Sequence, residues 1–228
     1  MALVVEGKTI LFDAGPDIKY QLRKYHLKPD AVFISHEHPD ANYGLRYLKD
    51  VHPVKSSEAG SARRLFHRVK IFSEKSGNVK PGVPISVFGV EILPFRVKHS
   101  KIAPYTGYLI KIPNPKSQFP NKSQISKYQT RNVTYVTDMT STAGIEKYVR
   151  GCDILFADGS ILRRNLGGHL SITNQLKIYK KWRLKKVIFT HIGHDTLPHK
   201  DLVKYIKGRY KNADVAYDGM AITLRKYE

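Results

Sequence analysis

Residues 35–40 read Ser35-His36-Glu37-His38-Pro39-Asp40 and follow the apolar run Ala31-Val32-Phe33-Ile34. Alternate residues of an extended segment face the same side, so His36, His38 and Asp40 are expected to point toward one another. Two imidazoles and a carboxylate at one point are ligands that a zinc-type cation requires. The segment therefore predicts a short strand that delivers a metal-binding loop at its end.

The same arrangement, an apolar strand that ends on an aspartate or a histidine, recurs four times along the chain. The residues at these strand ends are Asp13, His99, Asp138 and His191. A lone histidine at a strand end is more often structural, but several in one short chain indicate a shared site. We therefore expect the five segments to contribute to the same chemistry.

The composition is typical of a globular protein without covalent cross-links. A chain of 228 residues, 41% of them hydrophobic, is long enough to bury a sizeable core in one domain over residues 1–228. Cys152 is the only cysteine, which excludes an intramolecular disulfide and a multi-cysteine zinc site. The sequence has no apolar run of the roughly 18 residues that a membrane span needs and no recognisable signal peptide. We therefore expect a soluble, cytoplasmic protein that does not bind membranes.

The charge balance is strongly basic. The chain has 39 Lys and Arg against 19 Asp and Glu, for a formal net charge of +20. A field of this size attracts polyanions over long distances. A lysine-rich proteome or a solubility adaptation would produce the same balance. The charge nevertheless favours nucleic acid or a small phosphodiester substrate as the partner.

Periodicity and turn residues predict alternating short strands and helices. The expected helices are Asp17–Tyr25, Asn42–Lys49, Ser57–Phe66, Ile145–Val149, Ile172–Trp182 and Leu202–Ile206. The expected strands are Leu3–Val5 and Thr9–Phe12 as a hairpin, then Ala31–Ile34, Ile85–Val87, Val90–Phe95, Tyr108–Ile112, Val133–Val136, Ile154–Phe156, Val187–Phe189, Val215–Tyr217 and Ile222–Leu224. The polar, proline-containing stretch Pro113–Arg131 predicts a surface loop or hairpin extension.

This ordered set of residues resembles the metallo-β-lactamase superfamily, and the resemblance covers most of the chain. The family pattern is an early Asp, then H-x-H-x-D-H, a lone His, a bridging Asp and a final His. The chain offers, in this order, Asp13, His36, His38, Asp40, His99, Asp138 and His191. The resemblance implies an α+β fold, an αβ/βα four-layer sandwich of two mixed β-sheets with outer helices and the metals at one edge.

The resemblance also implies one or two divalent metal ions, with zinc expected and manganese or iron as alternatives. It assigns His36, His38 and His99 to a first metal, Asp40 and His191 to a second, and Asp138 to a bridge between them. Asp13 is expected to orient the ligands from outside the coordination sphere. The alternative for Asp13 is a simple turn aspartate before Gly15-Pro16.

One position departs from the family pattern, because Ala41 stands where the family usually has a histidine. A methyl group cannot bind a metal, so the second site loses a nitrogen donor. Three outcomes stay open: a weaker second metal, a single metal, or a substitute ligand. His194 is the candidate for the substitute ligand, and a contact to phosphate or to the leaving group is its alternative role.

The segment Gly167-Gly168-His169-Leu170-Ser171 is similar to the histidine motif of tRNA 3′-processing nucleases and of cyclic phosphodiesterases. In those enzymes the histidine contacts the scissile phosphate or the leaving group. The resemblance implies catalytic roles for Asp40, His169 and Asp158, with Asp158 paired to His169. An ordinary helix cap with an exposed histidine is the alternative.

These residues predict a metal-dependent hydrolase that uses a metal-activated water. Phosphodiester bonds are the favoured target, as in a nuclease or a cyclic phosphodiesterase. Arg163 and Arg164 precede His169, and their guanidinium groups are suited to substrate phosphate oxygens. A carbonyl hydrolase on the same fold (lactonase, thioesterase or β-lactamase) is one alternative. A nucleic-acid-binding protein with a decayed metal site is the other.

The segment before Asp13 has twelve residues, fewer than this family usually carries there. We therefore expect one sheet to have an uncovered edge, or a homodimer to form across it. The long arm of the tRNA-processing enzymes is not evident in the sequence, which counts against a role restricted to tRNA.

Overall fold

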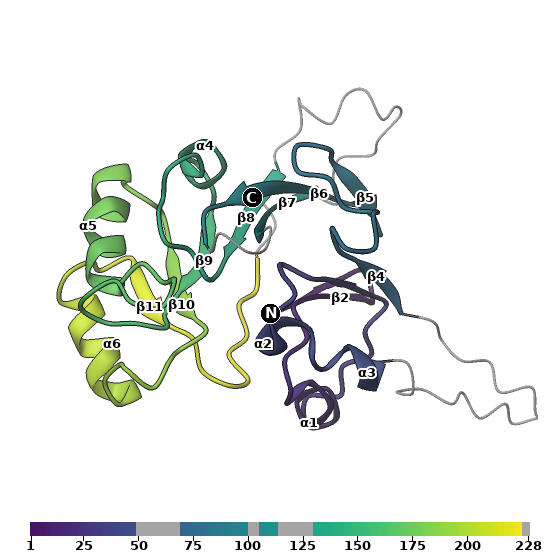
Figure 1. The fold of residues 1–228 in the computed structure, drawn as a ribbon, viewed down its shortest axis with the longest axis horizontal. Helices are drawn as coiled ribbons and strands as arrows, with labels where there is room; N and C mark the ends of the chain where they lie inside the picture. Colours follow the sequence, from purple (N-terminus) through teal and green to yellow (C-terminus); the bar gives the residue numbers. More distant parts are fainter. Residues whose placement is uncertain (49–68, 100–104, 114–129, 225–228) are drawn as a thin grey trace, which may run out of the picture. The chain divides into compact units, whose positions relative to one another are not determined.

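The computed structural model describes residues 1–48, 69–99, 105–113 and 130–224. The chain divides into two compact units, Met1–Lys80 and Pro81–Glu228, each with its own β-sheet (Figure 1). The predicted helix Ser57–Phe66 and nearly all of the predicted loop Pro113–Arg131 lie outside the described residues. The single domain over residues 1–228 stays a prediction.

The first unit contains a mixed four-stranded sheet. Its strands, in spatial order, are β1 (Ala2–Val5), β2 (Lys8–Phe12), β3 (Ala31–Phe33) and β4 (Lys70–Phe72). β1 and β2 form the predicted antiparallel hairpin around Glu6 and Gly7, both of which have positive φ, as a tight two-residue turn requires. β3 and β4 continue the sheet in parallel. β1 is thus an edge strand of this sheet, and the predicted homodimer across such an edge stays a prediction.

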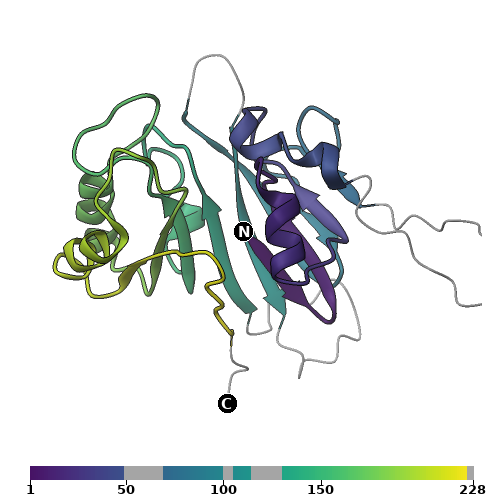
Figure 2. The ribbon, with the colours of Figure 1, turned by 90° about the horizontal axis from the view of Figure 1, so that it is seen from below.

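One helix of the first unit packs on the sheet, and two short ones follow the histidine loop. Helix α1 (Ile18–Lys24) lies against the sheet (Figure 2). Its Ile18 and Leu22 are buried against apolar side chains of β2 and β3. Helices α2 (Pro39–Asn42) and α3 (Leu45–Leu48) replace the single predicted helix Asn42–Lys49. The helix is interrupted because the backbone N–H of Gly44 donates to Ala14 O at 2.7 Å, away from its own helix.

The second unit contains a mixed seven-stranded sheet. In spatial order its strands are β11 (Ala213–Val215), β10 (Val187–Thr190), β9 (Ile154–Asp158), β8 (Thr130–Val136), β7 (Tyr105–Pro113), β6 (Val90–Val97) and β5 (Ile85–Val87). β5 to β8 are antiparallel neighbours, whereas β8 to β11 are parallel. The parallel strands are connected through helices α4 (Glu146–Val149), α5 (Ile172–Trp182) and α6 (His199–Lys207). The carboxyl ends of these strands therefore lie at one edge of the sheet.

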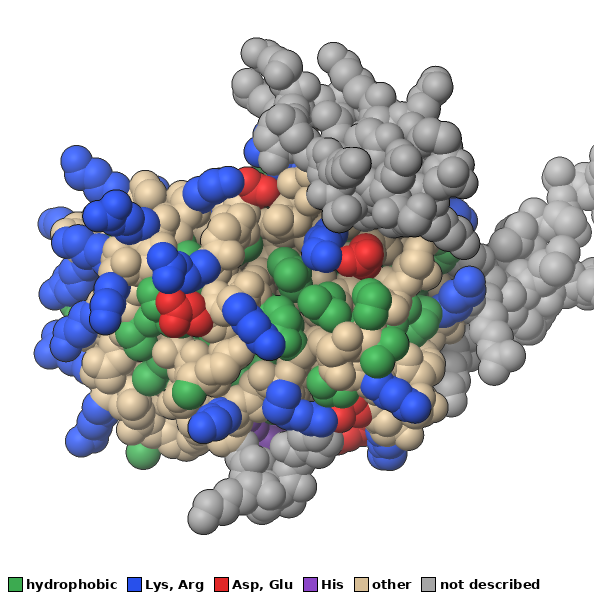
Figure 3. Space-filling model, turned by 90° about the horizontal axis from the view of Figure 1, so that it is seen from above, with side chains coloured by type: hydrophobic (Ala, Val, Ile, Leu, Met, Phe, Trp, Pro, Cys, Tyr) green, Lys and Arg blue, Asp and Glu red, His purple; other side chains and the backbone are tan. Residues whose placement is uncertain are grey.

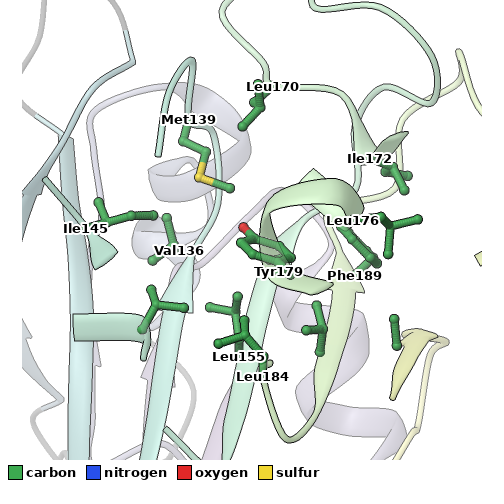
Figure 4. Close-up of a cluster of buried hydrophobic side chains, with 14 of the residues drawn as sticks. Val136, Met139, Ile145, Leu155, Leu170, Ile172, Leu176, Tyr179, Leu184 and Phe189 are labelled. Carbon is green, nitrogen blue, oxygen red and sulfur yellow. The ribbon is translucent and has the colours of Figure 1, made fainter. Parts of the chain in front are cut away.

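Helix α5 covers the middle of the large apolar core of this unit (Figure 4). Ile172, Leu176 and Tyr179 have helical spacing and are buried against the sheet, where Phe189 lies on β10. The helix begins after Ser171, whose hydroxyl accepts from the backbone N–H of Asn174. The core thus fixes α5, and with it the segment that precedes the helix.

Two strand predictions are wrong at the end of the chain. Residues 222–224 form no strand in the structure, although Ile222–Leu224 was expected to be one. The strand predicted at Val215–Tyr217 lies two residues earlier, because Ala213 and Val215 are the residues that pair with β10 and are buried. Tyr217 is 59% exposed. Strand β4 was not predicted.

The remaining predicted helices and strands within the described ranges are present, with ends shifted by a few residues. β7, for example, begins at Tyr105 where Tyr108 was expected. Among the described residues, no helix is both long and apolar enough to cross a membrane.

Cys152 is buried in the core of the second unit, and this burial raises the pKa of its thiol to about 11. The unfolded thiol, with an ordinary pKa near 9, ionises first. The contribution of Cys152 to stability is therefore present below pH 9 and is lost as the pH rises toward 11. At pH 8 we expect a disulfide reagent such as DTNB to react at least about 100-fold more slowly with native than with denatured protein. Equal rates would contradict the buried position.

Candidate metal centre

The predicted histidine loop brings three possible ligands together in the first unit. His36, His38 and Asp40 each offer a ligand atom, and these atoms lie within 4.8 Å of one another. His36 Nε2 lies 3.7 Å from Asp40 Oδ1. His36 is buried, whereas His38 and Asp40 are exposed. The predicted convergence of these side chains is confirmed, and the donor set suits a divalent cation.

Asp13 holds this loop through Ser35. The backbone N–H of Ser35 donates to Asp13 Oδ1 at 2.7 Å, and its hydroxyl donates to Asp13 Oδ2 at 2.9 Å. The same hydroxyl lies 2.9 Å from His36 Nδ1. Because the hydroxyl proton goes to the carboxylate, the hydroxyl oxygen accepts from Nδ1–H, and the ring lone pair is on Nε2. Nε2 is the atom turned toward Asp40, so this chain of contacts orients His36 for metal binding.

Replacing Ser35 with alanine is expected to weaken divalent-metal binding about 10- to 100-fold, because His36 loses the partner that fixes its ring. Competition with a chromophoric chelator measures the affinity, and circular dichroism checks the fold. Ser35→Thr keeps the hydroxyl and is expected to restore binding. If the alanine variant binds metal as tightly as the wild type, the positioning role is wrong.

A second group of possible ligands lies in the second unit. Asp138, His169 and His191 each offer a ligand atom, and these atoms lie within 4.8 Å of one another. Asp138 Oδ1 is 3.3 Å from His191 Nδ1 and 3.5 Å from His169 Nδ1. Asp138 follows β8 and His191 follows β10, at the shared edge of the parallel strands.

Three of the predicted residues at strand ends have backbones in the left-handed region. The φ values are 63° at Asp13, 51° at Asp138 and 56° at His191. Residues other than glycine seldom adopt this conformation, and it costs about 1–3 kcal/mol at each position. Such strain is frequent where a strand end must turn a side chain into a functional site, so it supports the assignment of these residues to a site.

The grouping differs from the sequence prediction in two respects. His169 was expected at the substrate phosphate, and it lies with Asp138 and His191. His99 was expected to bind metal, but it belongs to neither group of three that the described residues form. The imidazoles of His99 and His169 are nevertheless neighbours, with ring centroids 5.6 Å apart.

The His99 ring is oriented by the loop that precedes α5. His99 Nδ1 lies 2.9 Å from Gly168 O. A carbonyl only accepts, so Nδ1 carries the hydrogen and Nε2 the lone pair that a metal would use. Gly168 has φ 91°, and a Cβ at this position would lie 2.8 Å from His99 Cε1. Glycine is therefore required at position 168 for this close approach.

The predicted pairing of Asp158 with His169 is present, at 2.8 Å between Asp158 Oδ2 and His169 Nδ1. Burial opposes ionisation of Asp158, but hydrogen bonds from His169, His191 and Ser160 outweigh it and hold the pKa of this carboxyl below its ordinary value. The hydrogen bond to Asp158 in turn raises the pKa of His169, against the effect of burial. His169 is therefore held in place with a proton on Nδ1.

Two residues that support this pair were not predicted. Ser160 donates to Asp158 Oδ1 from its hydroxyl at 2.6 Å and from its backbone at 3.0 Å, and the hydroxyl lies 3.1 Å from His191 Nδ1. Gln175 donates to the backbone oxygens of Asp158 and Leu170 at 2.8 and 2.6 Å. Gln175 is fully buried on the apolar face of α5. A polar residue at such a position is the signal that could have revealed it.

The other predicted residues do not join either group. Ala41 is 3% exposed in α2, and its methyl side chain offers no ligand atom for a metal. His194, the candidate substitute ligand, is exposed and belongs to neither group of possible ligands in the described part of the chain. Arg163 and Arg164 are exposed in the segment between β9 and α5. Their predicted contact with substrate stays a prediction.

A shallow pocket of about 430 Å³ lies beside the histidine loop in the first unit, and no sequence motif predicted it. Glu37 lines it and lies 3.3 Å from Lys75 Nζ. The guanidinium of Arg46 lies 3.4 Å from the centroid of the Tyr43 ring on the same pocket wall. The pocket therefore combines charged groups with one aromatic face.

The family model described as "Beta-lactamase superfamily domain" matches residues 8–192. The match covers well over half of the chain, so the chain belongs to this family. The resemblance to the metallo-β-lactamase superfamily inferred from the histidines and aspartates is confirmed.

A curated relative is the octanoyltransferase of Porphyromonas gingivalis, which is 24% identical over 242 aligned residues. The alignment covers 97% of this chain but 45% of that protein. The chain thus spans less than half the length of the curated relative it matches. The name octanoyltransferase describes that whole protein, of which less than half is matched, so this activity is not assigned to the present chain.

Three solved structures share the fold of most of the chain. A diphosphatase from the PhnP family has a TM-score of 0.70 and 23% identity, with 99% of this chain and 83% of that chain covered. YhfI from Bacillus subtilis has a TM-score of 0.69 and 15% identity, with 96% and 89% covered. The short form of human tRNase Z has a TM-score of 0.65 and 19% identity, with 98% and 91% covered. The predicted fold class, two mixed sheets with helices in a metallo-β-lactamase fold, is confirmed.

Proposed function

We propose that this chain is a metal-dependent hydrolase of phosphodiester bonds. The observation that carries the proposal is the pair of the buried Asp158 and the half-buried His169 beside Asp138 and His191. Cleavage of a phosphodiester releases an alkoxide, which leaves more readily when a protonated group stands beside it. An imidazole held by a buried carboxylate next to a group of possible metal ligands meets this need.

The donor sets fit the metal that the family implies. The first unit would hold a divalent cation through His36, His38 and Asp40, and the second unit through Asp138 and His191. His99, which lies in neither group of three among the described residues, is the further ligand that the family resemblance implies. A bound cation supplies a water of lowered pKa and neutralises charge that develops on the phosphate oxygens.

The side chains around the second group have separate tasks. Asp158 fixes the Nδ1 proton of His169, which leaves Nε2 of the protonated ring to donate to the departing oxygen. Ser160 holds the Asp158 carboxylate and contacts His191. Arg163 and Arg164, in the segment that leads to His169, are suited to bind phosphate oxygens through their guanidinium groups.

The test offers three substrates side by side to the metal-loaded protein: bis(p-nitrophenyl) phosphate, a lactone and a chromogenic β-lactam. The proposal expects turnover of the phosphodiester, and loss of that turnover in a chelated sample. Turnover of the carbonyl substrates alone would overturn the phosphodiesterase assignment. A protein that retains no metal, but binds DNA or RNA with a steep salt dependence, would instead be a nucleic-acid-binding protein with a decayed site.

A further inference from the structure

Almost half of the net positive charge of the protein comes from residues 177–211. These 35 residues contain eleven Lys and Arg against two acidic residues, a net charge of +9 out of +20. The basic residues are Lys177, Lys180, Lys181, Arg183, Lys185, Lys186, Lys200, Lys204, Lys207, Arg209 and Lys211. The charge is therefore concentrated on helices α5 and α6 and the residues that follow each of them.

The two helices present one continuous surface. They follow the neighbouring parallel strands β9 and β10, and crossovers of one hand place them on the same face of the sheet (Figure 1). Thr173 Oγ1 of α5 lies 3.0 Å from Tyr205 OH of α6, and both helices bury apolar side chains in the same core. Figure 3 shows Lys and Arg side chains gathered on the side where Figure 1 places α5 and α6.

The cations gather toward the ends of the helices that lie away from the candidate site. His169 lies just before the start of α5, whereas Lys180, Lys181 and Arg183 are at its end. The 11 residues of α5 span about 16 Å. Lys204 and Lys207 are likewise in the last turn of α6. Lys180, Lys181 and Arg183 are therefore about one helix length from His169, and Lys177 is about half that distance along α5.

Most of this charge is not neutralised by neighbouring carboxylates. Lys207 is paired with Asp214 at 2.9 Å, and Lys185 with Asp153 at 2.9 Å. Within the described ranges, no carboxylate forms an ion pair with Lys177, Lys180, Lys181 or Lys204, all four of which are exposed. Basic residues in the last turn stabilise a helix by interacting with its dipole. This effect explains one or two cations per helix, but it does not explain eleven cations in 35 residues.

We propose that the lysine face, defined as Lys177, Lys180, Lys181 and Lys204 with their basic neighbours on α5 and α6, binds the phosphate backbone of a polynucleotide. The inference rests on the proposed phosphodiesterase function and narrows its substrate to a nucleic acid strand. A small diester bound at His169 cannot reach Lys180 and Lys181, which are about 16 Å away at the other end of α5. A nucleic acid strand can, because it carries one phosphate for each few ångströms of its length. Bound along this face, the strand would be held while one of its phosphates lies at the site.

The test uses the full chain with four substitutions, Lys177→Gln, Lys180→Gln, Lys181→Gln and Lys204→Gln. The matched control removes four exposed lysines elsewhere, Lys19→Gln, Lys28→Gln, Lys80→Gln and Lys147→Gln. Binding of a fluorescein-labelled 20-nucleotide RNA and of a duplex DNA is measured over a series of salt concentrations. Thermal melts confirm that both variants are folded.

The lysine-face variant is expected to bind RNA at least about 10-fold more weakly than the control. The slope of the logarithm of its binding constant against the logarithm of the salt concentration should be smaller in magnitude by about three. Both variants should hydrolyse bis(p-nitrophenyl) phosphate as the wild type does, since none of these lysines lies at the site. If the two variants lose affinity equally, or neither does, the lysine face is not the binding surface. Loss of binding to anionic vesicles, with RNA binding unchanged, would likewise overturn the proposal. Absence of all phosphodiester hydrolysis would count against the proposed function, while the RNA measurement would still decide the lysine face.

Discussion

Replacing Asp138 with asparagine is expected to lower phosphodiester hydrolysis about 1000-fold and to reduce the amount of bound metal. Asp138 Oδ1 lies within 3.5 Å of both His169 Nδ1 and His191 Nδ1, so its carboxylate is the negative charge at the centre of the second group. Asparagine has the same shape and tolerates the left-handed backbone found at this position. The change therefore removes charge with little effect on the fold.

Steady-state rates on bis(p-nitrophenyl) phosphate and elemental analysis of the purified variant measure this effect. Asp218→Asn, which removes an exposed carboxylate outside both groups, is the matched control and should behave as the wild type. An Asp138→Asn protein with wild-type rate and metal content would show that the second group does not bind metal.

Replacing His169 with alanine is expected to lower kcat about 100- to 10,000-fold on a phosphodiester whose leaving group is an alkoxide. An RNA strand and a methyl phosphodiester are substrates of this kind. The reason is that the imidazole held by Asp158 supplies the proton that this leaving group needs. The effect should be much smaller on bis(p-nitrophenyl) phosphate, because p-nitrophenolate leaves without a proton.

Metal content decides between the two roles that the structure leaves for His169, which lies in the same group as Asp138 and His191. A proton donor can be removed with the metal retained, whereas loss of a ligand should deplete it. We expect wild-type metal content in the His169→Ala variant. Depleted metal, together with equal loss of rate on both kinds of substrate, would make His169 a ligand and contradict the catalytic role.

The sequence could predict the residues whose placement depends on local geometry. His36, His38 and Asp40 converge as their alternation after a buried strand predicts, although Asp40 lies in the short helix α2 rather than in an extended segment. Asp138 and His191 follow strands β8 and β10, each of which ends in a buried and largely apolar stretch, and parallel strands end at the same edge. The pairing of Asp158 with His169 came from the resemblance to phosphodiesterases rather than from spacing.

The sequence could not predict features that depend on contacts between distant segments. Gly44 interrupts a helix because its backbone N–H bonds to Ala14, thirty residues earlier in the chain, and no local pattern indicates that contact. Ser160 contacts His191 only because the end of β10 brings this histidine to its hydroxyl. The strand expected at Ile222–Leu224 has alternating apolar residues but no partner strand in the described structure.

Metal dependence is tested by titrating metal-stripped protein with zinc or manganese while the hydrolysis of bis(p-nitrophenyl) phosphate is followed. We predict no detectable hydrolysis before metal is added and a rise to a plateau at one or two equivalents per chain. The number of equivalents also shows whether Ala41 leaves the protein with one metal or two. Hydrolysis that persists at its full rate after complete removal of metal would contradict the assignment of His36, His38, Asp40, Asp138 and His191 as ligands.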